Sequence, residues 1–276
     1  MNHITPRRAA GIAIGLFLTV VVLVQLVPFY VALTTALKAK TDLSPQLSFP
    51  LHNLYGGNFA DAIEQAGILR AMGNSLLVTS ISTTMVCLLG AFAAYPLARR
   101  RSRLNRGLLA VNVGLMMVPA LSIIVPLYSL LADIQALNTY WGEIVIMITY
   151  NLPLSIFLYS SFMRTLPTSV EEAARIDGAN LMQLMLKVII PMLRPVTATV
   201  AIITGVGVWN EYALSGYILT DPDNQTVAPS IASFFAGHTS NLPAATAASL
   251  LAVLPIVIAY LFLQKHFVQG LVGAEK

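Results

Sequence analysis

Six long apolar segments, separated by short polar ones, decide what this chain can fold into. Crossing a bilayer takes about 20 apolar residues in a helix, and each segment is long enough. The segments are too long and too evenly apolar for barrel strands, and in hydrocarbon the backbone must bond to itself. Only 10% of the residues are charged, against about 25% in soluble domains. The sequence therefore predicts an all-α integral membrane protein, a single transmembrane domain over 1–276, with six transmembrane helices at 9–33, 75–98, 108–131, 141–163, 195–219 and 244–264.

Arginine and lysine predict the orientation. With six spans both termini share one side, and that side carries thirteen of the sixteen basic residues. The excess of basic residues marks the cytoplasmic side. The net charge of +4 therefore needs no nucleic acid as a partner, and the cluster 99–106 is expected beside anionic lipid. The opposite side has only Lys38, Lys40 and Arg70.

Motifs for catalysis, metal binding and nucleotide binding are missing. The sequence has no GxxxxGK[ST] phosphate loop, no HExxH and no GxSxG, and its four histidines are scattered. Cys87 is the only cysteine, so no disulfide forms within the chain. We expect no catalytic residue, no metal site and no cofactor in this chain, and a role other than that of an enzyme.

A polar insert at 164–194 separates the fourth and fifth apolar segments. Either Thr168 or Ser169 can cap a first short helix, with a glutamate three residues later completing a capping box. Gly178 stands where a helix end favours a left-handed residue.

A second short helix is predicted directly after that glycine. Asn180 can cap it, with Gln183 at the reciprocal position. Its apolar face is predicted from helical spacing, and Pro191 and Pro195 mark the return to the membrane. The members of that face are Leu181, Leu184, Met185 and Val188.

The insert resembles the EAA loop of ABC importer permeases. Glu172-Ala173-Ala174 is followed by Gly178 and then by Val188-Ile189-Ile190-Pro191, with apolar replacements in the final Ile-x-Leu-Pro. Trp209-Asn210-Glu211-Tyr212 and the tail from Gln264 to Leu271 are similar to the carbohydrate-uptake branch of that family, most of all to its MalG-like half.

This resemblance implies a sugar importer's permease in a bacterial inner membrane, with cytoplasmic termini. Residues 168–178 would form a coupling helix that docks in a cleft of an ATP-binding subunit, where ATP and magnesium are bound. The implied partners are a second homologous permease, two ATP-binding subunits and an extracytoplasmic solute-binding protein. The implied coupling residues are Glu171, Glu172, Ala173, Ala174, Arg175, Asp177 and Gly178.

The predicted fifth span contains a polar and aromatic cluster of Trp209, Asn210, Glu211 and Tyr212. Acidic residues inside a membrane are costly and usually functional. Two interpretations stay open: direct contact with a sugar, or a structural or gating role. Glu143 lies near a membrane boundary, where we expect it to be solvated. Hydroxyl side chains of the second span, Ser80, Ser82, Thr83 and Thr84, are expected to bond neighbouring helices.

The segment 220–243 is the second extracytoplasmic loop of interest. By the resemblance it would contact the solute-binding protein. The residues predicted for this contact are Asp221, Asp223, Asn224, Gly237 and His238.

Two other functions fit parts of the pattern. An importer of the same class could carry another polar solute such as glycerol phosphate, although no Arg or Lys lies deep in a span. A transporter driven by an ion gradient would place its own ion-binding residues at the midplane, and only Glu211 is available there.

Overall fold

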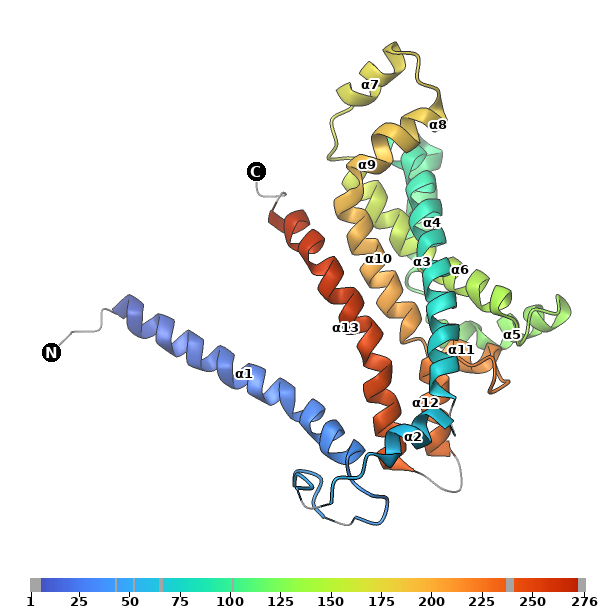
Figure 1. The fold of residues 1–276 in the computed structure, drawn as a ribbon. Helices are drawn as coiled ribbons and strands as arrows, with labels where there is room; N and C mark the ends of the chain where they lie inside the picture. The colour runs from blue at the N-terminus through green and yellow to red at the C-terminus, as the bar shows by residue number, and fades with distance from the viewer. Residues whose placement is uncertain are drawn as a thin grey trace. The chain divides into compact units, whose positions relative to one another are not determined.

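The computed structural model describes residues 6–42, 44–51, 53–64, 67–100, 102–236 and 241–272, and within these ranges it contains helices and no strand. The all-α prediction is therefore confirmed. Figure 1 shows the elements along the chain. They are α1 (Pro6–Ala36), α2 (Gly57–Glu64), α3 (Ile68–Arg99), α4 (Arg103–Leu115), η1 (Ala120–Ile123), α5 (Ile124–Asp133), α6 (Tyr140–Met163), α7 (Ser169–Ile176), α8 (Leu181–Leu184), the π-helix η2 (Met185–Ile189), α9 (Ile190–Met192), α10 (Arg194–Trp209), α11 (Ala213–Ile218), α12 (Val227–Ala236) and α13 (Leu242–Val272).

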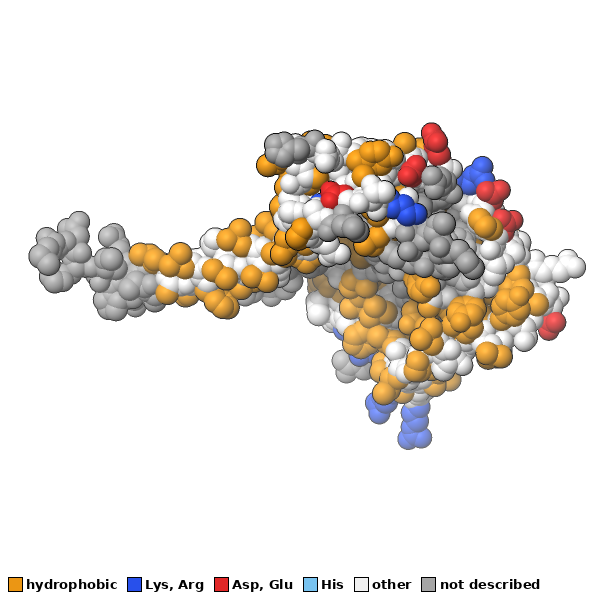
Figure 2. Space-filling model, turned by 90° about the horizontal axis from the view of Figure 1, so that it is seen from below, with side chains coloured by type: hydrophobic (Ala, Val, Ile, Leu, Met, Phe, Trp, Pro, Cys, Tyr) orange, Lys and Arg blue, Asp and Glu red, His pale blue; other side chains and the backbone are white. Residues whose placement is uncertain are grey.

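In the described part of the chain, three helices are individually long and apolar enough to cross a membrane. They are α1, α3 and α6, at the first, second and fourth predicted spans. Two further candidates are bent pairs, and α13 covers the sixth predicted segment. Apolar side chains cover much of the surface in the space-filling view (Figure 2), as expected for a protein whose solvent is lipid.

The structure differs from the predicted third and fifth spans, the third by a bend within it and the fifth by an early end. Residues 103–115 and 120–133 meet at 94° rather than forming one straight helix. Pro119 precedes the second arm, and its missing N–H and fixed φ explain the break. Residues 181–192 and 194–209 meet at 77°. The fifth predicted span also stops early, because helix α10 ends at Trp209 and α11 begins at Ala213.

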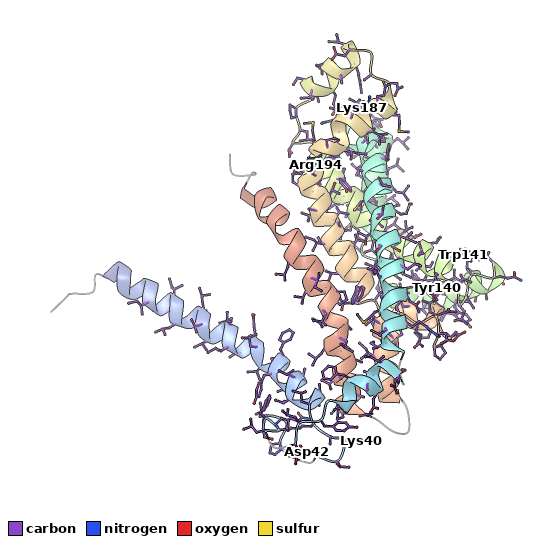
Figure 3. The ribbon with its side chains drawn as sticks, in the orientation of Figure 1. Lys40, Asp42, Tyr140, Trp141, Lys187 and Arg194 are labelled. Atoms are coloured by element: carbon purple, nitrogen blue, oxygen red, sulfur yellow. The ribbon has the colours of Figure 1, made fainter. Side chains whose placement is uncertain are left out.

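The chain divides into two units, Met1–Ile68 with Ile231–Ala252, and Leu69–Ser230 with Val253–Lys276. In the first unit, the loop after α1 is closed by side chains. Lys38, which is buried, donates its Nζ to the Pro45 carbonyl at 2.6 Å. Asn58 of α2 donates to the carbonyls of Ala36 and Lys38 at 2.8 and 2.7 Å. The Lys38 charge thus fixes this loop; Figure 3 labels its neighbours Lys40 and Asp42 on the same loop.

In the second unit, α3, α6 and α10 run side by side (Figure 1). A buried cluster joins α3 and α6 to the segment from α8 to α10, and it includes Tyr159, Met163, Leu184 and Ile189. The Tyr159 hydroxyl donates to Thr197 Oγ1 at 3.0 Å. The loop 164–194 is therefore anchored in the same apolar core as the spans.

Helices α3 and α6 are in close contact at Gly90. A Cβ atom there would lie 2.0 Å from Ser155 Oγ, which itself donates to the Val86 carbonyl at 3.1 Å. Small residues permit such contacts between helices in membranes. The close contact fixes α3 against α6, and α3 carries the residues that hold the site described next.

Candidate functional site

The first helix of the 164–194 loop, α7, lies at the same end of the unit as α8, α9 and the last turn of α3 (Figure 1). Gly178 follows it with φ +84°, the left-handed geometry that the sequence predicted. The predicted capping box at its start is not formed. Thr168 has helical dihedral angles and makes no side-chain cap bond, so its hydroxyl is not placed to accept from the first turn.

The second short helix begins as predicted. Asn180 Oδ1 accepts from the Gln183 N–H at 2.9 Å, and Gln183 Oε1 accepts from the Asn180 N–H at 3.0 Å. Its predicted apolar face is partly wrong, because Leu181 is exposed while Ile189 is buried. Ile189 lies at the end of the π-helix η2, whose wider turn changes the helical spacing on which the predicted face was based. Lys187 and Arg194 lie at this end of the unit, whereas Tyr140 and Trp141, at the start of α6, lie well away from it (Figure 3).

Helix α7 has two chemically different faces, and its two glutamates lie on different ones. Glu171 is only 5% exposed and points into the protein, whereas Glu172 is exposed. Ala173 is also exposed, and Ile176 is 86% exposed, so an acidic and apolar face is free for a partner. Ala174 packs against the buried cluster below.

Charged side chains on the inward face of α7 form an ionic cluster with residues of α3. Arg99 Nε donates to Glu171 Oε1 at 2.6 Å, and Arg99 Nη2 lies 2.5 Å from the same oxygen. The Tyr95 hydroxyl donates to Glu171 Oε2 at 2.9 Å and accepts from Arg175 Nη2 at 2.9 Å. We call Tyr95, Arg99, Glu171 and Arg175 the Glu171 cluster. No sequence motif identifies Tyr95, and the sequence predicts Arg99 only as part of the basic cluster beside lipid.

The remaining residues of the motif complete the turn after α7. Asp177 is the exposed C-cap residue, and its N–H donates to the Ala173 carbonyl at 3.0 Å. The Ala179 N–H donates to the Ala174 carbonyl at 3.0 Å. These bonds use backbone groups alone, so the Asp177 carboxylate stays available on the surface.

The polar cluster of the fifth span lies at the break between α10 and α11. The Glu211 carboxylate accepts from the N–H groups of Leu214 and Ser215 at 3.1 and 2.8 Å, so it caps α11. The prediction that Glu211 lies within a continuous span is therefore wrong. Asn210 Nδ2 donates to the Val206 carbonyl at 2.8 Å. Tyr212 is 57% exposed.

A cavity of about 540 Å³ adjoins this break. It is lined by Trp209, by hydroxyl-bearing residues of α3 and by apolar residues of α10 and α13. The predicted bonds of Ser82 and Thr83 to other helices are not made within the described part of the chain, where both hydroxyls are buried and have no hydrogen-bond partner. The hydroxyl-bearing residues that line the cavity are Thr79, Ser80, Thr83 and Thr84.

Glu143 is buried, so the prediction of a solvated boundary residue is wrong. Its Oε1 accepts a hydrogen bond from the Ser215 hydroxyl, while Oε2 has no partner among the described residues. Glu143 and Glu211 therefore both bind Ser215, one at its side chain and one at its backbone.

The start of the 220–243 segment is fastened to the turn between α5 and α6. Asn138 lies in that turn with φ +56°. Its Oδ1 accepts from the Asp221 N–H at 2.9 Å, and its carbonyl accepts from Asn224 Nδ2 at 3.1 Å. Asp223 forms an ion pair with Arg70. The structure thus brings these three predicted contact residues together, while Gly237 and His238 lie outside the described residues.

Comparisons with known proteins give one consistent result. Residues 87–273 match the family described as the binding-protein-dependent transport system inner membrane component. The melibiose/raffinose/stachyose import permease protein MelC of Bacillus subtilis is 39% identical over 259 residues, covering 94% of each chain. The diacetylchitobiose uptake system permease protein NgcG of Streptomyces coelicolor is 33% identical, covering 95% of this chain and 87% of that protein.

The fold also matches a solved structure. A chain of a bacterial ABC transporter that imports the acidic polysaccharide alginate superposes with a TM-score of 0.79, covering 97% of this chain and 99% of that chain. The identity is 20%, so this match establishes the fold alone.

Proposed function

This chain belongs to the family of inner-membrane components of binding-protein-dependent transport systems, and on that premise we propose that it carries a sugar or short oligosaccharide across the bacterial inner membrane. It is a permease subunit of the carbohydrate-uptake ABC type, so its work is transport rather than catalysis. The named relatives that import melibiose and diacetylchitobiose support a neutral sugar as the cargo.

The outward face of α7 is the observation that carries the mechanism. Glu172, Ala173 and Ile176 are exposed together while Glu171 holds the same helix from inside. A negative charge beside small and apolar side chains suits a cleft with a basic rim. We propose that this face docks on an ATP-binding subunit in the cytoplasm, which binds ATP and magnesium.

The assembly follows from a single coupling helix in the chain. One coupling helix docks one ATP-binding subunit, so a pair of ATP-binding subunits requires a second permease with its own coupling helix. We therefore propose two homologous permeases and two ATP-binding subunits. Closure of the ATP-binding subunits would move α7 and shift the spans between inward-open and outward-open states. In this arrangement both termini are cytoplasmic, and the Asp221, Asp223 and Asn224 cluster faces the extracytoplasmic solute-binding protein.

The break after Trp209 has a structural role in this proposal. The Glu211 carboxylate is already occupied by two N–H groups, and the Asn210 amide nitrogen donates to its own helix. Trp209, by contrast, lines the cavity. We assign Glu211 and Asn210 to shaping the broken span, and Trp209 to the wall of the transport path.

The experiment reverses the charge on the docking face. Glu172→Lys in the full chain, expressed with its partners, is expected to leave membrane insertion intact but to abolish recovery of the ATP-binding subunit in mild detergent. A repulsive charge at a docked face costs several kcal/mol, or about a hundredfold in affinity. Glu64→Lys is the matched control, because Glu64 is exposed on α2, and it should bind the ATP-binding subunit as the unaltered chain does.

Recovery and solute-stimulated ATP hydrolysis are measured on the same preparations. Normal recovery and normal stimulation in Glu172→Lys would refute the assignment of α7 as the docking helix. A chain that purifies with no ATP-binding subunit even when unaltered would refute the proposed function itself.

A further inference from the structure

The Glu171 cluster is the main inward attachment of α7. Among the described residues of this helix Glu171 is the buried one. An isolated helix of eight residues is not stable in water, so α7 depends on its contacts with the rest of the unit. The bonds from Glu171 to Arg99 and Tyr95 are the polar part of these contacts, and the packing of Ala174 on the buried cluster is the apolar part.

Both partners of Glu171 belong to the last turns of α3. This helix is 32 residues long, which corresponds to about 48 Å at 1.5 Å per residue. It is continuous, and it is fixed against α6 at Gly90. A displacement of α7 that pulls on Arg99 and Tyr95 therefore acts on the end of one helix, in which Pro96 lies between these two residues.

The other end of α3 holds the segment that begins the 220–243 loop. Asn74 Nδ2 donates to the carbonyls of Asp223 and Gln225, both at 3.0 Å. Ser75 Oγ accepts from the Val227 N–H at 2.8 Å, and Arg70 forms an ion pair with Asp223. One helix therefore bonds directly to α7 at one end and to this loop at the other.

We propose that the Glu171 cluster and α3 form a mechanical link between the docking helix and residues 223–227, at the start of the 220–243 loop, with Glu171 as a positioning residue for coupling rather than for docking. The link builds on the proposed function, since it requires α7 to dock on an ATP-binding subunit. Binding of the loaded solute-binding protein at the loop then stimulates ATP hydrolysis through α3, and coupling between two sites acts in both directions.

The two glutamates of α7 thus have separable roles, and the test exploits this. Glu172 contacts the partner, so changing it alters binding. Glu171 contacts Arg99, so changing it leaves the exposed face in place and alters what a docked subunit can transmit. A purely structural role for the cluster would change stability but not the ratio of stimulated to basal ATP hydrolysis in the assembled complex.

The experiment uses the whole complex in membranes with its solute-binding protein. Glu171→Gln keeps the size of the side chain and removes its ion pair. The complex is expected to contain the normal amount of ATP-binding subunit and to keep its basal ATP hydrolysis. Stimulation by loaded solute-binding protein, and solute transported per ATP, should each fall about tenfold, within the usual range for coupling between sites.

Two further variants and a control distinguish loss of coupling from misfolding. Tyr95→Phe removes one hydroxyl and should reduce stimulation less than Glu171→Gln does. The exchange Glu171→Arg with Arg99→Glu restores opposite charges and should recover part of the stimulation lost in either single variant. Glu64→Gln, the matched change on an exposed glutamate of α2, should behave as the unaltered chain.

The outcomes separate the link from the proposed function. Normal stimulation in Glu171→Gln, with an unaltered complex that is itself stimulated, overturns the link and leaves the proposed function standing. Loss of the ATP-binding subunit from a folded Glu171→Gln complex also overturns it, because Glu171 would then act in docking. An unaltered chain that recovers no ATP-binding subunit overturns the proposed function.

Discussion

Ile176 gives the most quantitative test of the docking face. It is 86% exposed on α7 beside Glu172, and it is a large apolar side chain that the described residues leave uncovered. Ile176→Ala removes three carbon groups, each worth about 0.8 kcal/mol when buried. With nearly all of that surface available to a partner, the loss is about 2 kcal/mol, or about a 30-fold weaker dissociation constant.

The assay titrates a purified ATP-binding subunit onto the permease complex in lipid discs. The fold should be unaffected because the side chain is exposed, and thermal unfolding of the chain checks this. Ile176→Leu conserves volume and serves as the control, with a much smaller expected loss. A dissociation constant for Ile176→Ala within about twofold of the unaltered chain, with normal unfolding, would show that this face stays uncovered in the complex.

Two glycines carry the remaining predictions. Gly178→Ala places a side chain at φ +84°, which costs about 1–2 kcal/mol, so recovery of the ATP-binding subunit should drop. Gly178→Asn should be better tolerated. Equal recovery with the unaltered chain, Gly178→Ala and Gly178→Asn would contradict the required left-handed turn. Gly90→Ala puts Cβ 2.0 Å from Ser155 Oγ, and we expect a loss of about 1–3 kcal/mol in the thermal unfolding of the chain. Adding Ser155→Gly should restore part of it, and no recovery in the double variant would show that the contact is not the cause.

Features set by neighbouring residues in the sequence could be predicted well. The left-handed Gly178 and the Asn180–Gln183 capping box need only residues within one turn. Long apolar segments placed α1 and α6 within three residues of their ends, whereas α3 begins at Ile68, seven residues before the predicted span. Pro119 stands at the break of the third segment, although the 94° angle depends on packing that hydropathy does not contain.

Features set by distant partners were missed. Glu171 and Glu172 are adjacent and chemically identical, and only the position of Arg99, 72 residues earlier, separates a buried role from an exposed one. The capping prediction at Thr168 failed for the same reason, because Arg99 and Tyr95 occupy the Glu171 carboxylate. The motif identified the correct helix but not which of its faces is free.

The errors at Glu143 and Glu211 have one common cause. Hydropathy averages over the segment 195–219 and hides the break after Trp209, yet a broken helix in a membrane must satisfy its freed N–H groups within the protein. Glu211 does so for the start of α11, and Ser215, whose N–H it accepts, also donates its hydroxyl to the buried Glu143. Two carboxylates that looked like a transport site and a solvated boundary residue instead meet at a single serine. An acidic residue in an apolar segment can therefore mark the point where the segment stops being a helix.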